Sequence, residues 1–350
     1  MYGNTERDHD ICSVIYENNI DGVTLSLSSL CCRRRAFIVT DDTVASLYLD
    51  KFKNSALDRF DICGTVILKH GEGSKDLNSL QLICSSMIES ELSRKDIVIN
   101  LGGGMVSDIG GFAASIYMRG IDYINIPTTL LGMVDSSIGG KTAVDFSGIK
   151  NVLGAFHFPI ATIICPDFLN TLKADDIKSG MGEIIKYYAV SGKFDISNSV
   201  PDDFSQLIMQ CCNIKKEFVL NDRYDNGMRK ILNFGHTFGH AFESASNFSV
   251  SPGEAVGLGM LAVCRFGEAL GITDADCFNE IKQKLDLFGM KTDYSHLTDG
   301  AVSELVHDKK YSSGNIDMVF IRHIGEPVIK SCSLETVKAF LSNEEWTNSA

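Results

Sequence analysis

Two histidines and a glutamate are the residues of this chain best suited to metal chemistry. The segment 229–240 reads RKILNFGHTFGH, and its His236 and His240 are four residues apart, so on a helix they share one face. Upstream, Glu183 and Lys186 are three residues apart and would share a helical face as well. Imidazole and carboxylate groups are typical ligands of a divalent cation. The spacing alone predicts a Lewis-acid site with both histidines as ligands; the alternative is a pair of helix histidines bonded to backbone or water.

A glycine turn between a strand and a helix is the second candidate site. Residues 96–101 (DIVINL) have the pattern of a buried strand, and Gly102, Gly103 and Gly104 follow it directly. Glycine lets the backbone approach a pyrophosphate, and the start of the next helix offers N–H donors. The triplet is not the GxGxxG fingerprint, and such turns also occur for packing alone, so dinucleotide binding and packing remain alternatives.

Residues 127–141 (PTTLLGMVDSSIGGK) place hydroxyls, Asp135, a glycine pair and Lys141 beside a strand end. Ligands of α/β proteins bind at such carboxyl ends, which favours a ligand site over an ordinary capped loop. Further cations are scattered along the chain, and they matter only if the fold gathers them. Together they would bind phosphate and carboxylate groups: Lys150, Lys186, Lys215, Arg229 and Lys310.

Composition narrows the classes of function. The chain has 350 residues, 44% of them hydrophobic, and a net charge of −13, which argues against nucleic-acid binding. Its 11 cysteines show no paired CxxC spacing, which indicates reduced thiols and a cytoplasmic protein. The first residues are polar and no apolar run reaches transmembrane length, so we expect neither a signal peptide nor a membrane partner.

The elements that must position these residues change in kind near the middle of the chain. Apolar runs predict strands at 36–40, 65–68, 96–101, 123–126 and 161–165, alternating with helices, which is typical of a parallel sheet. Helical periodicity then predicts helices at 178–191, 203–220, 228–246, 254–270 and 275–288, with a strand pair at 318–321 and 326–329. The expected fold is an α/β nucleotide-binding domain over 1–174 and a mostly α-helical metal and substrate domain over 175–350.

Taken together, these blocks resemble 3-dehydroquinate synthase, of the sugar-phosphate cyclase family. The resemblance runs from about residue 36 to 330 and is carried by residues 102–141, 150–159, 180–186 and 229–243. It implies an N-terminal NAD-binding α/β domain and a C-terminal helical metal domain. It further implies NAD and a divalent metal, zinc or cobalt, as cofactors, a homodimer, and a place in the cytoplasm.

The resemblance also assigns roles by matching position. It implies that NAD is held by Asp41, Glu72, Lys75, Gly103, Gly104, Asp108, Thr128, Thr129 and Lys150. The substrate would be held by Lys141, Asn151, Lys215, Arg229 and Lys310, with Arg119 reaching the phosphate in the neighbouring subunit. Catalytic roles fall to His240, Lys186, Asp135 and Asn233, and the metal ligands would be Glu183 and His236, with His240 moving protons rather than binding metal.

One departure from the family pattern concerns the metal. The family takes its third ligand from a histidine in the motif HGEAV, whereas this chain reads PGEAV over 252–256, so Pro252 occupies the histidine's place. Proline has no side-chain donor atom. Three alternatives follow: Glu183, His236 and water hold the metal weakly, His240 or Glu254 completes the site, or the site stays empty. Smaller departures are Thr43, where asparagine is frequent, and Arg223, where an acid is usual.

The implied reaction is that of an NAD- and metal-dependent carbon–oxygen lyase. It converts 3-deoxy-arabino-heptulosonate 7-phosphate to 3-dehydroquinate and phosphate, in the shikimate pathway of aromatic amino-acid biosynthesis. Alternatives are another sugar-phosphate cyclase, an NAD-dependent alcohol dehydrogenase, or a degenerate relative without turnover. Another cyclase is disfavoured by Lys215 and Arg229, which suit a carboxylate. An alcohol dehydrogenase is disfavoured by the residues of the phosphate side, Asn151, Lys186, Asn233 and Lys310. Only Pro252 favours a degenerate relative.

Overall fold

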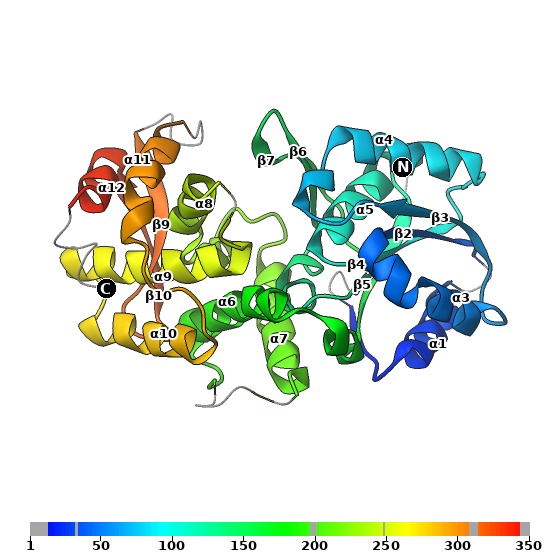
Figure 1. Ribbon diagram of the computed structural model, residues 1–350, viewed down its shortest axis with the longest axis horizontal. Coiled ribbons are helices and arrows are strands. Elements are labelled where there is room, and N and C mark those ends of the chain that lie inside the picture. The colour runs from blue at the N-terminus through cyan, green and yellow to red at the C-terminus, as the bar shows by residue number, and fades with distance from the viewer. Residues whose placement is uncertain are drawn as a thin grey trace, which may run out of the picture. The chain divides into compact units, whose positions relative to one another are not determined.

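The computed structural model describes residues 13–31, 34–196, 201, 203–247, 249–307 and 314–343. The chain divides into two compact units (Figure 1). The first runs up to Leu172 and includes Lys215–Leu220; the second comprises Lys173–Ile214 and the chain from Asn221 onward. The sequence pattern did not indicate that residues 215–220 return to the first unit. The functional division at residue 174 stays a prediction.

A six-stranded parallel sheet forms the centre of the first unit. Its strand order is β1-β8-β5-β4-β2-β3, with bounds β1 Val14–Tyr16, β2 Ala36–Asp41, β3 Ile62–Leu68, β4 Ile97–Gly102, β5 Asp122–Pro127 and β8 Ala161–Ile164. β2 and β4 are buried along their whole length, which explains their continuous apolar runs. The predicted α/β class of this part is confirmed.

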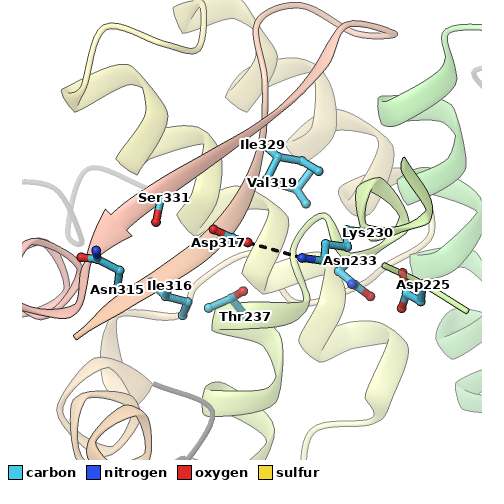
Figure 2. A pocket seen from close by; sticks show the side chains of 10 residues that line it. All are labelled: Asp225, Lys230, Asn233, Thr237, Asn315, Ile316, Asp317, Val319, Ile329 and Ser331. Carbon is cyan, nitrogen blue, oxygen red and sulfur yellow. Dashed lines mark hydrogen bonds and ion pairs between the residues drawn. The ribbon is translucent and has the colours of Figure 1, made fainter. Parts of the chain in front are cut away.

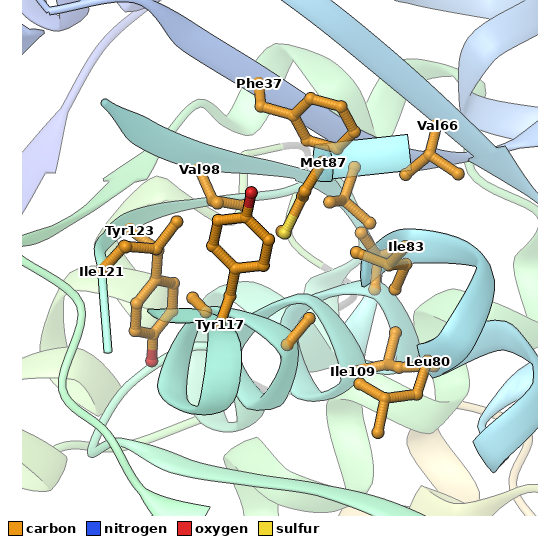
Figure 3. Packing of buried hydrophobic residues seen from close by; sticks show 14 of the residues in the cluster. Phe37, Val66, Leu80, Ile83, Met87, Val98, Ile109, Tyr117, Ile121 and Tyr123 are labelled. Atoms are coloured by element: carbon orange, nitrogen blue, oxygen red, sulfur yellow. The ribbon is translucent and has the colours of Figure 1, made fainter. Parts of the chain in front are cut away.

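Helices cover both faces of this sheet (Figure 1). On one side lie α1 (Ile20–Cys31) and α3 (Asp50–Ala56); on the other lie α4 (Leu77–Glu89) and α5 (Gly104–Ile116). Between the sheet and α4–α5, strand residues such as Phe37, Val98 and Tyr123 belong to one buried cluster with the helix residues Ile83 and Ile109 (Figure 3). This core holds the carboxyl ends of β2, β4 and β5 at one edge of the sheet.

An antiparallel hairpin, which the sequence patterns did not predict, follows the polar segment after β5. It consists of β6 (Lys141–Phe146) and β7 (Ile149–Phe156). β6 packs on α5, whereas β7 is largely exposed. Because both faces of β7 are partly in water, its sequence lacks the apolar alternation by which strands are recognised.

The second unit is mostly helical, as predicted. Its elements are α6 Ala174–Ser191, α7 Ser205–Asn221 (whose residues 215–220 group with the first unit), α8 His236–Ala245, α9 Pro252–Ala269, α10 Ala275–Leu287, α11 Thr298–His307, α12 Leu334–Leu341 and the antiparallel strands β9 Asn315–Ile321 and β10 Pro327–Ser333. α9 packs against α6, α8, α10 and β9 (Figure 1). Phe238, Phe266, Phe320 and Phe340 form an aromatic core beside it. No helix among the described residues is long and apolar enough to span a bilayer.

The predicted helix over 228–246 is wrong in its first half. Met228–Asn233 form a 3₁₀ helix, and Gly235 has a φ of 80°, a left-handed conformation that ends it. The α-helix begins only at His236. His236 and His240 therefore lie in the first turns of α8, and Arg229 and Asn233 lie on a separate short helix.

Candidate active site

The glycine turn lies at the carboxyl edge of the parallel sheet. Gly103 caps α5, which begins at Gly104, and a Cβ on Gly104 would lie 2.8 Å from Ser136 Oγ. Around this edge, the buried hydroxyls of Thr40, Thr128 and Ser136 have no hydrogen-bond partner among the described residues. Buried hydroxyls normally have partners, so these atoms indicate a place where a bound polar molecule would complete the bonding. The turn thus serves packing and also fits a ligand.

Lys75 is the charged centre of the predicted dinucleotide site. Its side chain is only 4% exposed, and its Nζ donates to Asp108 Oδ2 at 2.5 Å and to Glu72 Oε1 at 3.4 Å. Burial lowers the pKa of Lys75, but the two carboxylates outweigh it, and the pKa lies above its ordinary value. The structure thus brings together three of the predicted NAD residues.

Asp41 stands apart from that cluster. Its Oδ1 caps the short helix α2 (Asp42–Val44) by accepting from the amides of Thr43 at 2.9 Å and Val44 at 3.0 Å. Burial raises the pKa of Asp41, and these amides oppose the rise. Thr128 N–H donates to the carbonyl of Gly102 at 3.0 Å, and Thr129 Oγ1 accepts from Gly132 N–H, so both threonines border the glycine turn.

Asp135 and Lys215 form an ion pair that the sequence did not predict. Lys215 Nζ lies 2.8 Å from the Asp135 carboxylate and 2.6 Å from its carbonyl oxygen, and the lysine is 6% exposed. Lys141 begins β6, Lys150 and Asn151 lie on β7, and Arg119 is exposed after α5 with a φ of 68°. Lys310 lies outside the described residues.

In the second unit, Glu183 and His236 lie side by side. His236 Nε2 is 3.6 Å from Glu183 Oε1, and Lys186 Nζ forms an ion pair with Glu183 Oε2. Two ligands of a tetrahedral zinc ion, each about 2.1 Å from the metal, are roughly 3.4 Å apart, so this pair has the spacing of two metal ligands. Glu183 and Lys186 are almost fully buried.

A third protein ligand is missing from the described part of the chain. There, no three His, Cys, Asp or Glu side chains are grouped so that they could hold a metal ion. His240 is exposed, with its ring edge-on to His236 at 5.5 Å between centroids, and does not join the pair in such a group. The described arrangement therefore shows only the Glu183–His236 pair, and the role of His240 stays a prediction.

Position 252 nevertheless lies next to the turn of α6 that bears Glu183. Gly253 N–H donates to Ser179 Oγ at 3.2 Å, and a Cβ on Gly182 would lie 2.1 Å from Gly253 O, so the start of α9 touches the turn of α6 that bears Glu183. Glu254 is bonded to the N-cap residue of α9, since Ser251 Oγ accepts from its amide at 3.4 Å and donates to its carboxylate at 3.1 Å. Its carboxylate is thus used at the helix end.

Arg229 is buried, with 3% exposure, and is oriented by Asp222, which the sequence analysis did not assign. Asp222 accepts from the amides of Asn226, Gly227 and Arg229 at 3.1, 2.7 and 3.0 Å. Burial raises the pKa of Asp222, but the three amides outweigh it and leave the pKa below its ordinary value. Arg229 Nη1 donates to the backbone carbonyl of Arg223. The side chain at position 223 takes no part in this hydrogen bond.

A cavity of about 620 Å³ adjoins the short helix that carries Arg229 and Asn233 (Figure 2). Lys230 and Asp317 form an ion pair at its wall, 3.4 Å apart. Asn315, Asp317 and Ser331 line it from β9 and β10. Sequence reasoning missed these residues because it began the strand at residue 318; the alternation of Asn315 and Asp317 with Ile316 and Met318 is the signal that could have found them.

Comparison with known proteins covers both units. The family description "3-dehydroquinate synthase N-terminal" matches residues 65–179, and "3-dehydroquinate synthase C-terminal" matches residues 180–311. The 3-dehydroquinate synthase of Clostridium botulinum is 38% identical over 95% of this chain and 97% of its own. That of Streptococcus mutans is 37% identical over 96% of this chain and 97% of its own. The 2-epi-5-epi-valiolone synthase of Streptomyces hygroscopicus, solved with NAD+ and Zn2+, has a TM-score of 0.86, 25% identity and 97% coverage of both chains.

Proposed function

The chain belongs to the 3-dehydroquinate synthase family, and from this premise we propose that it converts 3-deoxy-arabino-heptulosonate 7-phosphate to 3-dehydroquinate and phosphate. The observation that carries the proposal is that both family descriptions match this chain. The matched residues include the Glu183–His236–Lys186 cluster and the Lys75–Asp108 pair. The reaction belongs to the shikimate pathway of aromatic amino-acid biosynthesis. We place it in the cytoplasm, where the free cysteines of the described chain would stay reduced.

NAD fits the edge of the parallel sheet. The cofactor would be held by Glu72, Lys75, Gly103, Gly104, Asp108, Thr128 and Thr129, with Asp41 and Lys150 at its margins, and the unpaired hydroxyls of Thr40 and Thr128 would find partners there. When bound, NAD supplies a hydride acceptor for a ring hydroxyl and later returns the hydride. The protein's part is to orient the dinucleotide with Lys75 and with the first amides of α5.

The metal fits less completely. Glu183 and His236 have the spacing of two ligands, and the position of the family's third ligand is occupied by Pro252. A divalent ion, zinc or cobalt, would lower the pKa of a coordinated hydroxyl and polarise a carbonyl when bound. Lys186 neutralises Glu183 and would point its ammonium at the substrate's phosphate end.

The remaining residues would bind and orient the sugar phosphate. Lys215 and Arg229 would bind the carboxylate; Lys141, Asn151, Lys186 and Lys310 would bind the phosphate. Asp135 holds Lys215 in place, Asn233 would bind a substrate hydroxyl, and His240, exposed at the start of α8, would move protons. In a homodimer, Arg119 would reach the substrate of the neighbouring subunit.

A turnover assay tests this proposal. Purified protein is given the heptulosonate phosphate, NAD and either Zn2+ or Co2+, and both phosphate and 3-dehydroquinate are measured. Glu183→Gln is the matched control, because it keeps the side-chain size and removes the charge that binds the metal. We expect the wild type to form phosphate and 3-dehydroquinate in equal amounts. Glu183→Gln should form less of both. Absence of both products at saturating metal would favour a degenerate relative that binds without turnover, for which Pro252 is the supporting observation.

A further inference from the structure

The hairpin β6–β7 contains a bulge at the two residues that we assign to ligands. The strands pair in register from Lys141 and Phe156 to Val144 and Leu153, and then shift so that Phe146 lies opposite Ile149. Residues 150–152 of β7 therefore stand opposite the single residue Asp145. Asn151 has a φ of 53°, a left-handed conformation that asparagine tolerates better than most residues. Bulges of this kind re-aim side chains next to active sites, and this one presents Lys150 and Asn151.

Asp145 makes two bonds that connect this bulge to the predicted dinucleotide loop. Its Oδ1 accepts from the amide of Asn151 at 2.7 Å and so supports the left-handed residue. Its own amide donates to the carbonyl of Lys75 at 2.8 Å, at the end of the loop that carries Glu72 and Lys75. The Asp145 carboxylate is also among the charges that act on Lys75. One residue thus bonds to both segments.

Little apolar packing holds the end of the hairpin. Phe146, Ile149 and Val152 are each about half exposed, at 48%, 49% and 48%. Segments with few buried apolar contacts have low local stability. The position of Lys150 and Asn151 therefore depends on polar bonds such as those of Asp145.

We propose that Asp145 is a positioning residue that couples the Glu72–Lys75 loop to the bulge bearing Lys150 and Asn151, so that NAD and the phosphate group bind cooperatively. The inference rests on the proposed function, which assigns NAD to the loop and the phosphate end to Asn151. Ordering of the loop by NAD would be transmitted through the Asp145 amide to the bulge. Coupling is reciprocal, so phosphate would tighten NAD binding by the same factor by which NAD tightens phosphate binding.

The test compares two variants that both remove the charge of Asp145, of which only one keeps an oxygen acceptor. Asp145→Ala removes Oδ1 and keeps the backbone amide, whereas Asp145→Asn keeps an oxygen acceptor and removes the charge. Glu89→Ala, an exposed carboxylate on α4, controls for the change in net charge. NAD is titrated by calorimetry with and without inorganic phosphate. We expect Asp145→Ala to weaken NAD binding about fivefold, as for one lost hydrogen bond, and to abolish the effect of phosphate. Asp145→Asn and Glu89→Ala should behave as the wild type.

Two results would overturn the proposal: unchanged NAD affinity and phosphate effect in Asp145→Ala, or an Asp145→Asn variant as defective as Asp145→Ala. Hydrogen exchange of peptides covering 70–76 and 141–156 gives a readout that needs no cofactor. Asp145→Ala should accelerate hydrogen exchange in both peptides. Exchange at wild-type rates in this variant would contradict the proposal that Asp145 joins the two segments. A wild type that binds no NAD would refute the proposed cofactor, and the exchange data would still decide whether Asp145 joins the two segments.

Discussion

Pro252 stands at the first helical position of α9, where a proline costs no hydrogen bond because that amide has no partner inside the helix. Proline at this position is therefore compatible with the fold. Ser251 caps the helix through the Glu254 amide and also bonds to the Glu254 carboxylate. The exposed position of Pro252, next to the turn of α6 that bears Glu183, leaves room for a larger side chain.

Replacing Pro252 with histidine should increase metal content. A third protein ligand would join Glu183 and His236. Loss of a residue that only hydrogen-bonds to a metal ligand commonly lowers metal affinity about 10–100-fold. Gain of a direct ligand should raise the affinity by at least as much. We expect the natural chain to hold little zinc after purification and Pro252→His to approach one equivalent, with turnover rising in parallel. Elemental analysis measures this, and Pro252→Ala is the control without a donor. A full equivalent of tightly bound zinc in the natural chain would contradict the expectation.

Arg229 should decide between a carboxylate substrate and a carboxylate-free one. Arg229 is buried, and Asp222 accepts a hydrogen bond from its backbone amide. Loss of its guanidinium should remove a charged hydrogen bond to the substrate, worth about 1.5–3 kcal/mol. Arg229→Ala should raise the KM for the heptulosonate phosphate by at least about tenfold. A carboxylate-free analogue should bind the variant and the wild type alike. Equal losses for both ligands would refute the assigned role.

At the scale of the elements, glycines set how closely the helices of the second unit approach. Gly182 and Gly253 bring α6 and α9 together, and Gly239 brings α8 to α9, since a Cβ on it would lie 2.8 Å from Ala255 O. The glycines around the histidines thus allow close approach of a backbone. These contacts hold Glu183 of α6 and His236 of α8 at the same end of α9.

Gly253→Ala should destabilise the protein. The added Cβ would lie 1.8 Å from the carbonyl oxygen of Ser179, and neither helix can move without disturbing the core. Overpacking of this kind costs about 1–3 kcal/mol, against a gain of roughly 1 kcal/mol in helix propensity. We expect a lower midpoint in urea and weaker metal binding. Gly73→Ala, in open space, should leave the midpoint unchanged. A variant as stable as the wild type would show that the helices can separate.

The start of β4 should make the stability of the first unit depend on pH. Burial raises the pKa of Asp96, but Arg35 at 2.8 Å and the Ser93 amide at 2.7 Å outweigh it and bring the pKa to about 2. A lowered pKa stabilises the fold above the unfolded value of about 3.9, and the contribution is lost as pH falls toward 2. Because Arg35 is partly exposed, we expect only about 1–2 kcal/mol.

Asp96→Asn provides the measurement for this contribution. Urea unfolding at pH 7 should show the variant less stable than the wild type, and the difference should shrink steadily below about pH 4. Asp122→Asn serves as the control, because the Asp122 carboxylate, paired with Arg34, is 36% exposed whereas that of Asp96 is 6% exposed, and it should change stability less. A difference independent of pH would mean that the Asp96 carboxylate does not supply the effect.

At the scale of the whole molecule, the proposed function requires two subunits, because Arg119 is assigned to the neighbouring substrate. Arg119 is exposed, and it and Met118 both have positive φ values, of 68° and 48°. Such conformations cost energy in residues other than glycine, and they persist where surrounding structure holds them. Residues 118 and 119 are therefore held in a defined conformation, and Arg119 is the residue at which to test whether two subunits share a substrate site.

Mixing two inactive variants tests whether the site is shared. Arg119→Ala and Lys141→Ala each lack one phosphate-binding cation, and a heterodimer would contain one site with both. After verified subunit exchange we expect activity to recover toward about a quarter of the wild-type level if sites form at random. Mixed Lys141→Ala and Lys150→Ala chains, both altered in the same hairpin, serve as the control and should not recover. A monomer by light scattering, or no recovery, would count against the shared site.

Local sequence was sufficient for five of the six parallel strands, for the glycine turn, for most of the helices between residues 174 and 287 and for the family, because each depends on residues close together in the chain. It did not indicate β1, α11 or α12. Continuous apolar runs such as 97–101 are typical of strands buried on both faces. The start of α9 at Ser251 is likewise indicated locally, by a serine three residues before a glutamate.

Only the tertiary structure decided which side chains meet. Asp135 with Lys215, Asp222 with Arg229, and Asp145 with both Lys75 and Asn151 are contacts between residues on different elements, some of them far apart in sequence. It also decided that Gly235 separates the short helix bearing Arg229 and Asn233 from α8, which bears both histidines. Spacing along a chain determines a shared helical face, but the distance between two side chains depends on how their elements pack, which here follows from backbone contacts at Gly182, Gly239 and Gly253.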